Sequence, residues 1–344
     1  MSRECHENQV KGENMTIILD AMGSDNYPSP EILGAIEAKK IISEEIILVG
    51  DKKLIKQKME KLSVDKDSFT IVHAPEIVEM WEKPVESAKK KPNNSMAVGI
   101  RLVKEKKGSS FVTAGNTGGA MFNGLRVLGR MKGVQRPALC AIFPTKKGSC
   151  IVLDIGANAD CRPDFLHQFA IMGSIYSKII NHIDNPKVGL ISNGEEAGKG
   201  NQLVKDTFKL LEKSTVNFIG NVEPKELFAG EADVVVTDGF TGNVFVKGSE
   251  AIAKFIIDVL KDSLMGSFRT KIGALLARPA FNSIKSLVDP SEIGAAPLLG
   301  LDRLVLVGHG RSDSQAITNS LILAHNATKS HLIEKMREGI SSKL

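Results

Sequence analysis

Aromatic residues are scarce in this chain: they make up 5% of its 344 residues and include a single tryptophan. Proteins that hold nucleic acids by base stacking need aromatic platforms, so the composition argues against a nucleic-acid partner. The sequence also lacks an apolar run of about 18 residues, the minimum for a membrane-spanning helix. The shares of hydrophobic (42%) and charged (25%) residues are typical of a globular protein with an ample core.

The four cysteines contain no C-x-x-C pair, which excludes the usual disulfide and zinc patterns and predicts free thiols in a reducing cytoplasm. No G-x-G-x-x-G follows the first apolar run, and no G-x-S-x-G is present. These absences argue against a dinucleotide cofactor and against a serine acyl-enzyme. We predict no cofactor and no metal, because Asp20 and Asp25 read as capping and turn residues rather than as ligands.

Short apolar runs alternate with helical patterns along most of the chain. Residues 1–14 are polar and are expected to form a disordered extension, and 15–344 a single α/β domain. The alternation of strand, glycine-rich loop and helix predicts a mainly parallel sheet sandwiched by helices. The runs 139–143 and 149–154 follow each other closely enough to form adjacent strands.

In parallel sheets, ligands bind beyond the carboxyl ends of the strands. Five predicted strand ends carry glycines and polar side chains, at 115–119, 154–158, 193–201, 238–243 and 309–313. Such loops present backbone N–H groups and helix N-termini to an anion. The candidate substrate-binding or phosphate-binding residues in the first four loops are Asn116, Thr117, Gly118, Asn158, Gly194, Glu195, Asp238 and Asn243.

Two of these loops offer groups for catalysis. The segment 194–200 resembles a Walker A loop but has a shorter glycine spacing and no Ser/Thr after the lysine. What remains is Lys199, a cation at a helix start that suits a phosphate; the alternative is a solvated lysine. His309 and Asp313 could supply acid–base chemistry, and the alternative for His309 is a histidine bonded to the loop backbone.

Positive charge is concentrated in two stretches. Residues 82–107 hold eight Lys/Arg and three Glu, and 254–285 hold six cations and two Asp. Within 255–287, apolar residues recur at helical spacing between the cations, which predicts a basic amphipathic hairpin broken near Arg278–Pro279. Its apolar face, with Phe268, Ile272 and Leu275, is expected to form a dimer interface or core, or to meet a membrane surface.

With these loops in place, the sequence resembles the PlsX family of bacterial phosphate acyltransferases. The resemblance runs from Met15 to the last helix. It departs from the family pattern at Ser24, where a second glycine is usual, and at Arg311, where a serine is usual. The motifs that carry it are Leu19–Gly23, Ala114–Gly118, Arg136–Leu139, Asp154–Asn158, Gly194–Glu196 with Gly198–Asn201, Asp238–Asn243 and His309–Asp313.

The resemblance implies a homodimer with an isopropylmalate-dehydrogenase-like fold related to phosphotransacetylases. It implies transfer of a fatty acyl group from acyl carrier protein to inorganic phosphate, giving acyl phosphate for phospholipid synthesis. The enzyme would be cytoplasmic, peripherally associated with the membrane and in contact with the membrane glycerol-3-phosphate acyltransferase. Two alternatives stay open: an acyl-CoA-dependent phosphotransacylase and a non-catalytic membrane scaffold of lipid synthesis.

We expect Lys199 and the backbone N–H groups of 116–118 to hold the phosphate, while neighbouring loop N–H groups stabilise the tetrahedral oxyanion. The leaving group is a thiolate with an ordinary pKa of about 8.5, which His309 or Asp313 could protonate.

Overall fold

The computed structural model describes residues 15–281, 284 and 289–343. The predicted extension 1–14 and part of the predicted hairpin therefore lie outside the described residues. The first half of the chain alternates strands and helices as expected. Its elements are β1 (Ile17–Asp20), α1 (Ser29–Ala38), β2 (Ile46–Gly50), α2 (Lys52–Lys61), β3 (Thr70–His73), α3 (Pro84–Lys90), α4 (Ser95–Lys104), β4 (Ser110–Thr113), α5 (Thr117–Val127), β5 (Ala138–Thr145) and β6 (Gly148–Leu153).

The second half continues the alternation and adds one long helical excursion. Its elements are α6 (Pro163–Ile180), β7 (Lys187–Ile191), α7 (Gln202–Leu211), β8 (Asn217–Val222), α8 (Pro224–Ala229), β9 (Val234–Val236), α9 (Gly239–Met265), α10 (Phe268–Leu276), α12 (Pro290–Ile293), β10 (Ala295–Leu299), β11 (Leu304–Gly308), α13 (Ser314–Lys329) and α14 (Leu332–Lys343).

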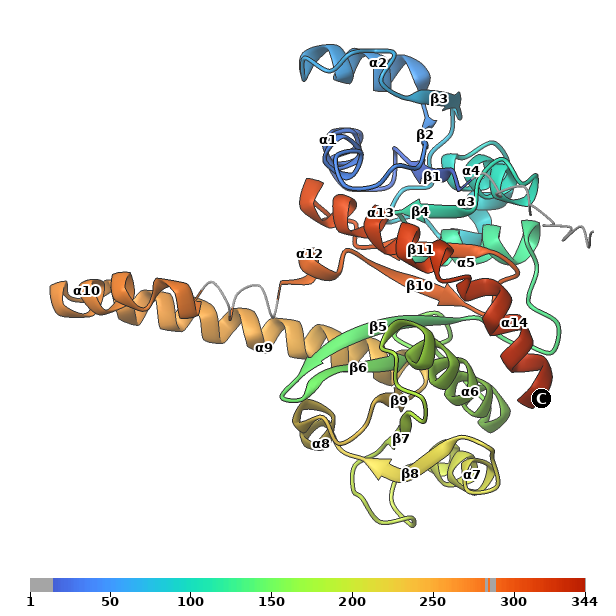
Figure 1. Cartoon of the computed structure of the whole chain (residues 1–344), viewed down its shortest axis with the longest axis vertical. Coiled ribbons are helices and arrows are strands. Elements are labelled where there is room, and N and C mark those ends of the chain that lie inside the picture. Colours follow the sequence, from blue (N-terminus) through green and yellow to red (C-terminus); the bar gives the residue numbers. More distant parts are fainter. Residues whose placement is uncertain (1–14, 282–283, 285–288, 344) are drawn as a thin grey trace, which may run out of the picture.

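The described strands form one sheet in the order β3-β2-β1-β4-β11-β10-β5-β6-β9-β7-β8 (Figure 1). The prediction of a mainly parallel sheet is confirmed. Strands 139–143 and 149–154 are also adjacent, as the antiparallel pair β5–β6. Because β10 is antiparallel to both β11 and β5 as well, the direction reverses three times at the centre of the sheet. The two parallel halves therefore run in opposite directions.

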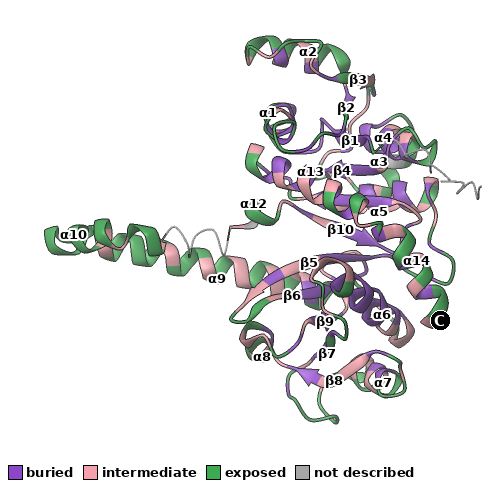
Figure 2. Ribbon diagram, in the orientation of Figure 1, coloured by how far each residue is buried: buried purple, intermediate pink, exposed green. Residues whose placement is uncertain are grey.

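Apolar side chains bury both faces of the sheet, as Figure 2 shows by the buried strands. One face packs against α1, α6, α13 and α14 in a large core cluster that contains Ile32, Phe169, Leu321 and Met336. The other face packs against α4 and α5 in the N-terminal half and against α8 and the start of α9 in the C-terminal half. The central strands β10 and β5 lie between these two helical groups.

The predicted amphipathic hairpin is an arm that projects from this body (Figure 1). Helix α9 turns at Gly266, and α10 begins after Ser267, whose side chain caps it, and folds back beside the outer part of α9. A second break at Ala277 lies next to the predicted one at Arg278–Pro279. The turn at Gly266 was not predicted. No helix within the described ranges is long and apolar enough to cross a membrane.

Candidate functional site

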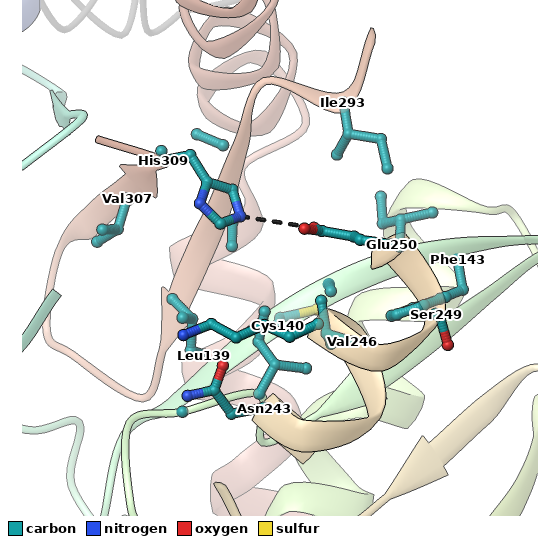
Figure 3. Close-up of a pocket in the computed structure, with 18 of the residues that line it drawn as sticks. Leu139, Cys140, Phe143, Asn243, Val246, Ser249, Glu250, Ile293, Val307 and His309 are labelled. Carbon is teal, nitrogen blue, oxygen red and sulfur yellow. Dashed lines mark ion pairs between the residues drawn. The ribbon is translucent and has the colours of Figure 1, made fainter. Parts of the chain in front are cut away.

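A cavity of about 620 Å³ lies over the central strands, between α9 and the loops that follow β4, β6 and β11. This volume falls within the range of about 300–1,000 Å³ that is usual for small-molecule sites. Figure 3 shows His309 and Glu250 on one side of it, Asn243 and Leu139 on another, and Phe143 and Ile293 toward one end. The cavity is where strand ends from both halves of the sheet converge.

Helix α9 forms one wall of the cavity, and the residues at its N-terminus hold it against the sheet. Asp238 caps its N-terminus by accepting hydrogen bonds from the Thr241 backbone N–H (2.9 Å) and hydroxyl (2.7 Å). Gly239 and Gly242 lie directly against the backbone of the loop after β6, so closely that a Cβ atom at Gly242 would overlap the carbonyl oxygen of Asp154. Glycine at these positions lets α9 reach the sheet.

The wall itself is one face of that helix. Asn243, Val246, Lys247 and Glu250 all line the cavity. Their spacing of three, four and seven residues places them on the same side of an α-helix. A polar amide, a cation and a carboxylate are thus presented together over the strands. Among the described residues, no carboxylate forms an ion pair with the Lys247 ammonium.

An electrostatic contact at the cavity joins α9 to the loop after β11. Oε1 of Glu250 lies 3.6 Å from Nε2 of His309, and Oε2 lies 2.8 Å from Nη2 of Arg311 (Figure 3). The interaction with His309 lowers the pKa of the Glu250 carboxyl; burial opposes this, and the charges of His309 and Arg311 lower the pKa further. Glu250 therefore presents a carboxylate to both His309 and Arg311.

The loop after β4 contributes the opposite edge of the site. Thr117, the first residue of α5, lines the cavity. Asn116 caps α5 by accepting from the Gly119 N–H at 3.0 Å. Its Nδ2 donates to carbonyl oxygens of the 79–82 segment, the closest being that of Met80 at 3.2 Å. Asn116 therefore holds both the helix start and Met80, which also lines the cavity.

The loop after β6 is shaped by a buried carboxylate. Oδ1 and Oδ2 of Asp154 accept hydrogen bonds from the backbone N–H groups of residues 139, 156, 157 and 158. Burial raises the pKa of Asp154, and these hydrogen bonds oppose the rise. Asn158 donates to Asp154 (2.9 Å) and to the carbonyl oxygen of Pro137 (2.7 Å). Both side chains support the loop, while Ile155 and Gly156 reach the cavity.

The structure brings together three of the predicted site residues, Thr117, Asn243 and His309, at the cavity. Four others lie in the supporting loops and do not line it: Asn116, Asn158, Asp238 and Asp313, the last of which caps α13 by accepting from the Ala316 N–H at 2.9 Å. Gly118 lies in the first turn of α5, where a Cβ atom would approach Pro84 to 2.6 Å.

The remaining predicted residues lie on the 193–201 loop after β7, which does not line the cavity. Lys199 and Glu195 are exposed, and Gly194 is buried beneath the Lys199 side chain. The reason is topological. Two strands, β9 and β6, separate β7 from β5, a strand that lines the cavity. Four of the five predicted loops converge on one site, and the fifth lies elsewhere.

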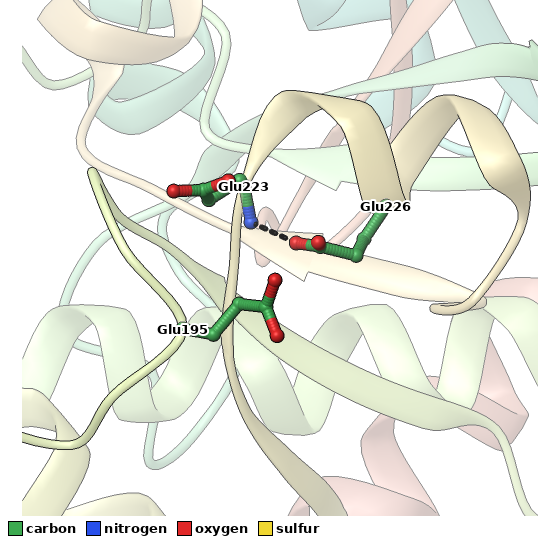
Figure 4. A group of neighbouring side chains, drawn as sticks. All are labelled: Glu195, Glu223 and Glu226. Carbon is green, nitrogen blue, oxygen red and sulfur yellow. Dashed lines mark hydrogen bonds between the residues drawn. The ribbon is translucent and has the colours of Figure 1, made fainter.

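Glu195 belongs to a separate acidic group with Glu223 and Glu226 (Figure 4). A cation already fills this group, because the ammonium of Lys225 lies 3.0, 2.9 and 3.3 Å from the three carboxylates in that order. Glu226 also accepts from the Glu223 backbone N–H at 2.7 Å within a capping box at the start of α8. The arrangement is that of a solvated ion-pair network.

Sequence reasoning missed Lys247 and Glu250. A signal for both was present: each falls on the helical face defined by Asn243, a residue already assigned to the site. The predicted strand-end loop ends at Asn243, and Lys247 and Glu250 lie beyond it on the helix. The three described cysteines are free, as predicted, and Cys140 and Cys150 are buried. Burial raises the pKa of the Cys140 thiol well above its ordinary value, which leaves it unreactive.

The predicted partner face is strongly exposed. On α10, Phe268 is 78% exposed and Leu275 is 68% exposed, and Ile272 is also exposed. The apolar side of α9 continues this surface through Ile252, Phe255 and Ile256. An exposed apolar surface of this extent on one arm is typical of an interaction site.

Comparisons with known proteins agree with this architecture. Residues 15–335 match the model of the family described as fatty acid synthesis protein. The chain is 44% identical over 329 residues to a phosphate acyltransferase of Dictyoglomus turgidum, covering 95% of this chain and 98% of the relative. It is 42% identical over 328 residues to a phosphate acyltransferase of Clostridioides difficile, covering 95% and 96%.

Among solved structures, the chain resembles a phosphotransacetylase of Streptococcus pyogenes with a TM-score of 0.60 and 18% identity, over 92% of this chain and 95% of the other. It resembles the EutD phosphotransacetylase of Staphylococcus aureus with a TM-score of 0.58, also at 18% identity and the same coverage. The predicted relation of the fold to phosphotransacetylases is confirmed.

Proposed function

The chain belongs to the fatty acid synthesis protein family, the PlsX phosphate acyltransferases, and we propose that it transfers a fatty acyl group from acyl carrier protein to inorganic phosphate. The product is an acyl phosphate for phospholipid synthesis. The observation that carries this proposal is the cavity, whose lining combines the polar residues Thr117, Asn243, Lys247 and His309 with many apolar side chains. A phosphate and a fatty thioester need these two environments side by side.

The reaction requires little acid–base chemistry. A phosphate oxygen attacks the thioester carbonyl carbon, the new C–O bond forms, and the C–S bond breaks to release a thiolate. Because phosphate is already nucleophilic, the site gains most by positioning it and by stabilising the oxyanion with fixed N–H donors. His309, held by Glu250, then gives its proton to the departing sulfur.

The phosphate needs a positive charge close to the thioester. Lys247 lines the cavity and forms no ion pair with a described carboxylate, and the first N–H groups of α5 lie at the same cavity beside Thr117. We assign the main charge to Lys247. Lys199, the residue predicted from sequence, lies on an exposed loop outside the cavity, so its role in phosphate binding stays a prediction.

The acyl donor distinguishes this proposal from the closest alternative, an acyl-CoA-dependent phosphotransacylase. Lys89, Lys90, Arg101 and Lys104 are exposed on α3 and α4, which pack against α5, the helix whose first residue lines the cavity. An exposed cationic surface suits an acidic carrier protein. Turnover is compared on palmitoyl carrier protein and palmitoyl-CoA at low salt; a clear preference for CoA contradicts the proposed donor.

The exposed apolar arm supports two further parts of the proposal. We assign the apolar faces of α9 and α10 to pairing with a second copy of the chain and to peripheral contact with a membrane from the cytoplasmic side, where they would approach the membrane glycerol-3-phosphate acyltransferase. A non-catalytic scaffold would use the same arm but would not need the polar end of the cavity.

A further inference from the structure

The lining residues on α9 change character along the helix. Asn243, Lys247 and Glu250 line the cavity in its first turns, whereas Ile252, Ala253 and Ile256 line it farther along. At 1.5 Å per residue, the wall from Asn243 to Ile256 is about 20 Å long. A trough of that length suits a linear hydrocarbon better than a compact acyl group.

The floor of the trough is strand β5. Leu139, Ala141 and Phe143 alternate along it and point to the same face of the sheet. On the neighbouring strand β10, Ala296 lines the cavity and pairs with Val307 of β11. Because Ala141 and Ala296 have small side chains, space remains between these strands and α9.

Aromatic rings pack where strand β5 approaches the first turns of α9. Phe143 packs against Phe245 with ring centroids 5.3 Å apart and against Phe228 at 6.3 Å. Phe228 and Phe245 also contact each other, at 5.7 Å. Three mutually packed rings resist displacement, because each would have to move the other two.

The opposite wall also contains a small residue. Ala253 lines the cavity one helical turn beyond Glu250, and Ile293, which precedes β10, also lines the cavity. Ala251 lies two residues earlier on the same helix but is exposed and does not line the cavity. The two alanines therefore differ only in whether their methyl groups face the trough.

We infer that the apolar trough between β5 and α9 binds the acyl chain, with the thioester at the polar end, and that Ala141 and Ala253 set the longest chain accepted. This inference rests on the proposed function. A larger side chain at either position narrows the trough beyond its polar end. Short acyl groups should still bind, whereas long ones should be excluded.

The experiment compares Ala141→Leu and Ala253→Leu with the matched control Ala251→Leu, using octanoyl, dodecanoyl and palmitoyl carrier protein. In both trough variants the ratio of kcat/KM for palmitoyl to that for octanoyl donor should fall at least about tenfold. The control should keep the wild-type ratio. An unchanged ratio in both trough variants, or an equal loss on all three donors, overturns the inference.

Calorimetric titration with palmitate and octanoate measures the affinity for each fatty acid and needs no turnover. Both trough variants should lose affinity for palmitate about tenfold and keep their affinity for octanoate. If wild-type protein forms no acyl phosphate from any donor, the proposed function fails, and the titration still decides the inference. Thermal unfolding of each variant identifies a folding defect; if Ala141→Leu is unfolded, Ala253→Leu on the helix carries the test.

Discussion

Nε2 of His309 lies 3.6 Å from Oε1 of Glu250, and Nη2 of Arg311 on the same loop lies 2.8 Å from Oε2, so Glu250 joins helix α9 to the loop after β11. His309 and Glu250 are 59 positions apart in the sequence and come from different elements. Their contact gives an exposed histidine a carboxylate partner that helix α9 holds in place.

Replacing Glu250 by Gln should lower turnover about tenfold while leaving KM for phosphate nearly unchanged, because His309 loses the carboxylate that positions it but the phosphate site keeps Lys247. Initial rates at varied phosphate measure both parameters. Asp258→Asn removes a carboxylate from an exposed position of the same helix and should have no effect. A raised KM with unchanged kcat would place Glu250 in binding instead.

The source of positive charge for phosphate is tested by three alanine substitutions, one of them a control. Lys247→Ala should raise KM for phosphate about tenfold or more, because a charge-assisted contact to the dianion is lost. Lys254→Ala, an exposed lysine farther along α9, is the control. Lys199→Ala tests the residue predicted from sequence: an unchanged apparent affinity for phosphate would show that its assignment is wrong.

The packing of α9 against the loop after β6 depends on Gly242. A methyl group there would overlap the Asp154 carbonyl oxygen, a backbone atom that cannot move aside. Gly242→Ala should lower the free energy of unfolding by about 3 kcal/mol and reduce activity. Gly248→Ala is the matched control, since a Cβ atom at Gly248 meets nothing within 4 Å; helix propensity should make it about 1 kcal/mol more stable. Urea unfolding measures both, and equal effects would contradict the packing described.

Glu31 makes the stability of the fold pH-dependent. The carboxyl is fully buried on α1, and burial raises its pKa from 4.5 to about 7. Between these values the folded chain binds more protons than the unfolded chain. The free energy of unfolding should therefore fall by up to about 3 kcal/mol as the pH rises through that window.

Urea unfolding at several pH values from about 5 to 8 measures this effect as the difference between the parent and Glu31→Gln, which cannot titrate. The difference between the free energies of unfolding of the parent and of Glu31→Gln should change between pH 4.5 and about 7. Glu37→Gln removes an exposed carboxylate from the same helix and should give a curve parallel to the parent. A parallel curve for Glu31→Gln as well would contradict the assignment.

The proposed contact between the arm and a membrane is tested by introducing negative charges on the arm. Phe268→Glu combined with Ile272→Glu places two anions on the exposed face of α10 and should abolish flotation with anionic lipid vesicles. Ile41→Glu changes an exposed isoleucine outside the arm and should float like the parent. If the double variant binds vesicles as well as the parent, the membrane role is wrong.

Much of the architecture could be predicted from local patterns. Apolar runs and glycine-rich loops gave the parallel sheet, and the periodicity after Gly239 gave the long helix. What could not be predicted is the reversal at β10, β5 and β6, because strand direction depends on long-range pairing such as Leu298 with Leu139. The order of the strands depends on the same long-range pairing. Because β9 and β6 lie between β7 and β5, Lys199 on the loop after β7 stays outside the cavity.

The most direct test of the account is the release of thiol from palmitoyl carrier protein, followed with and without inorganic phosphate while acyl phosphate is trapped with hydroxylamine. The account predicts thiol release that depends on phosphate and an equal amount of acyl phosphate. Thiol release that is independent of phosphate, or release without acyl phosphate, would contradict it.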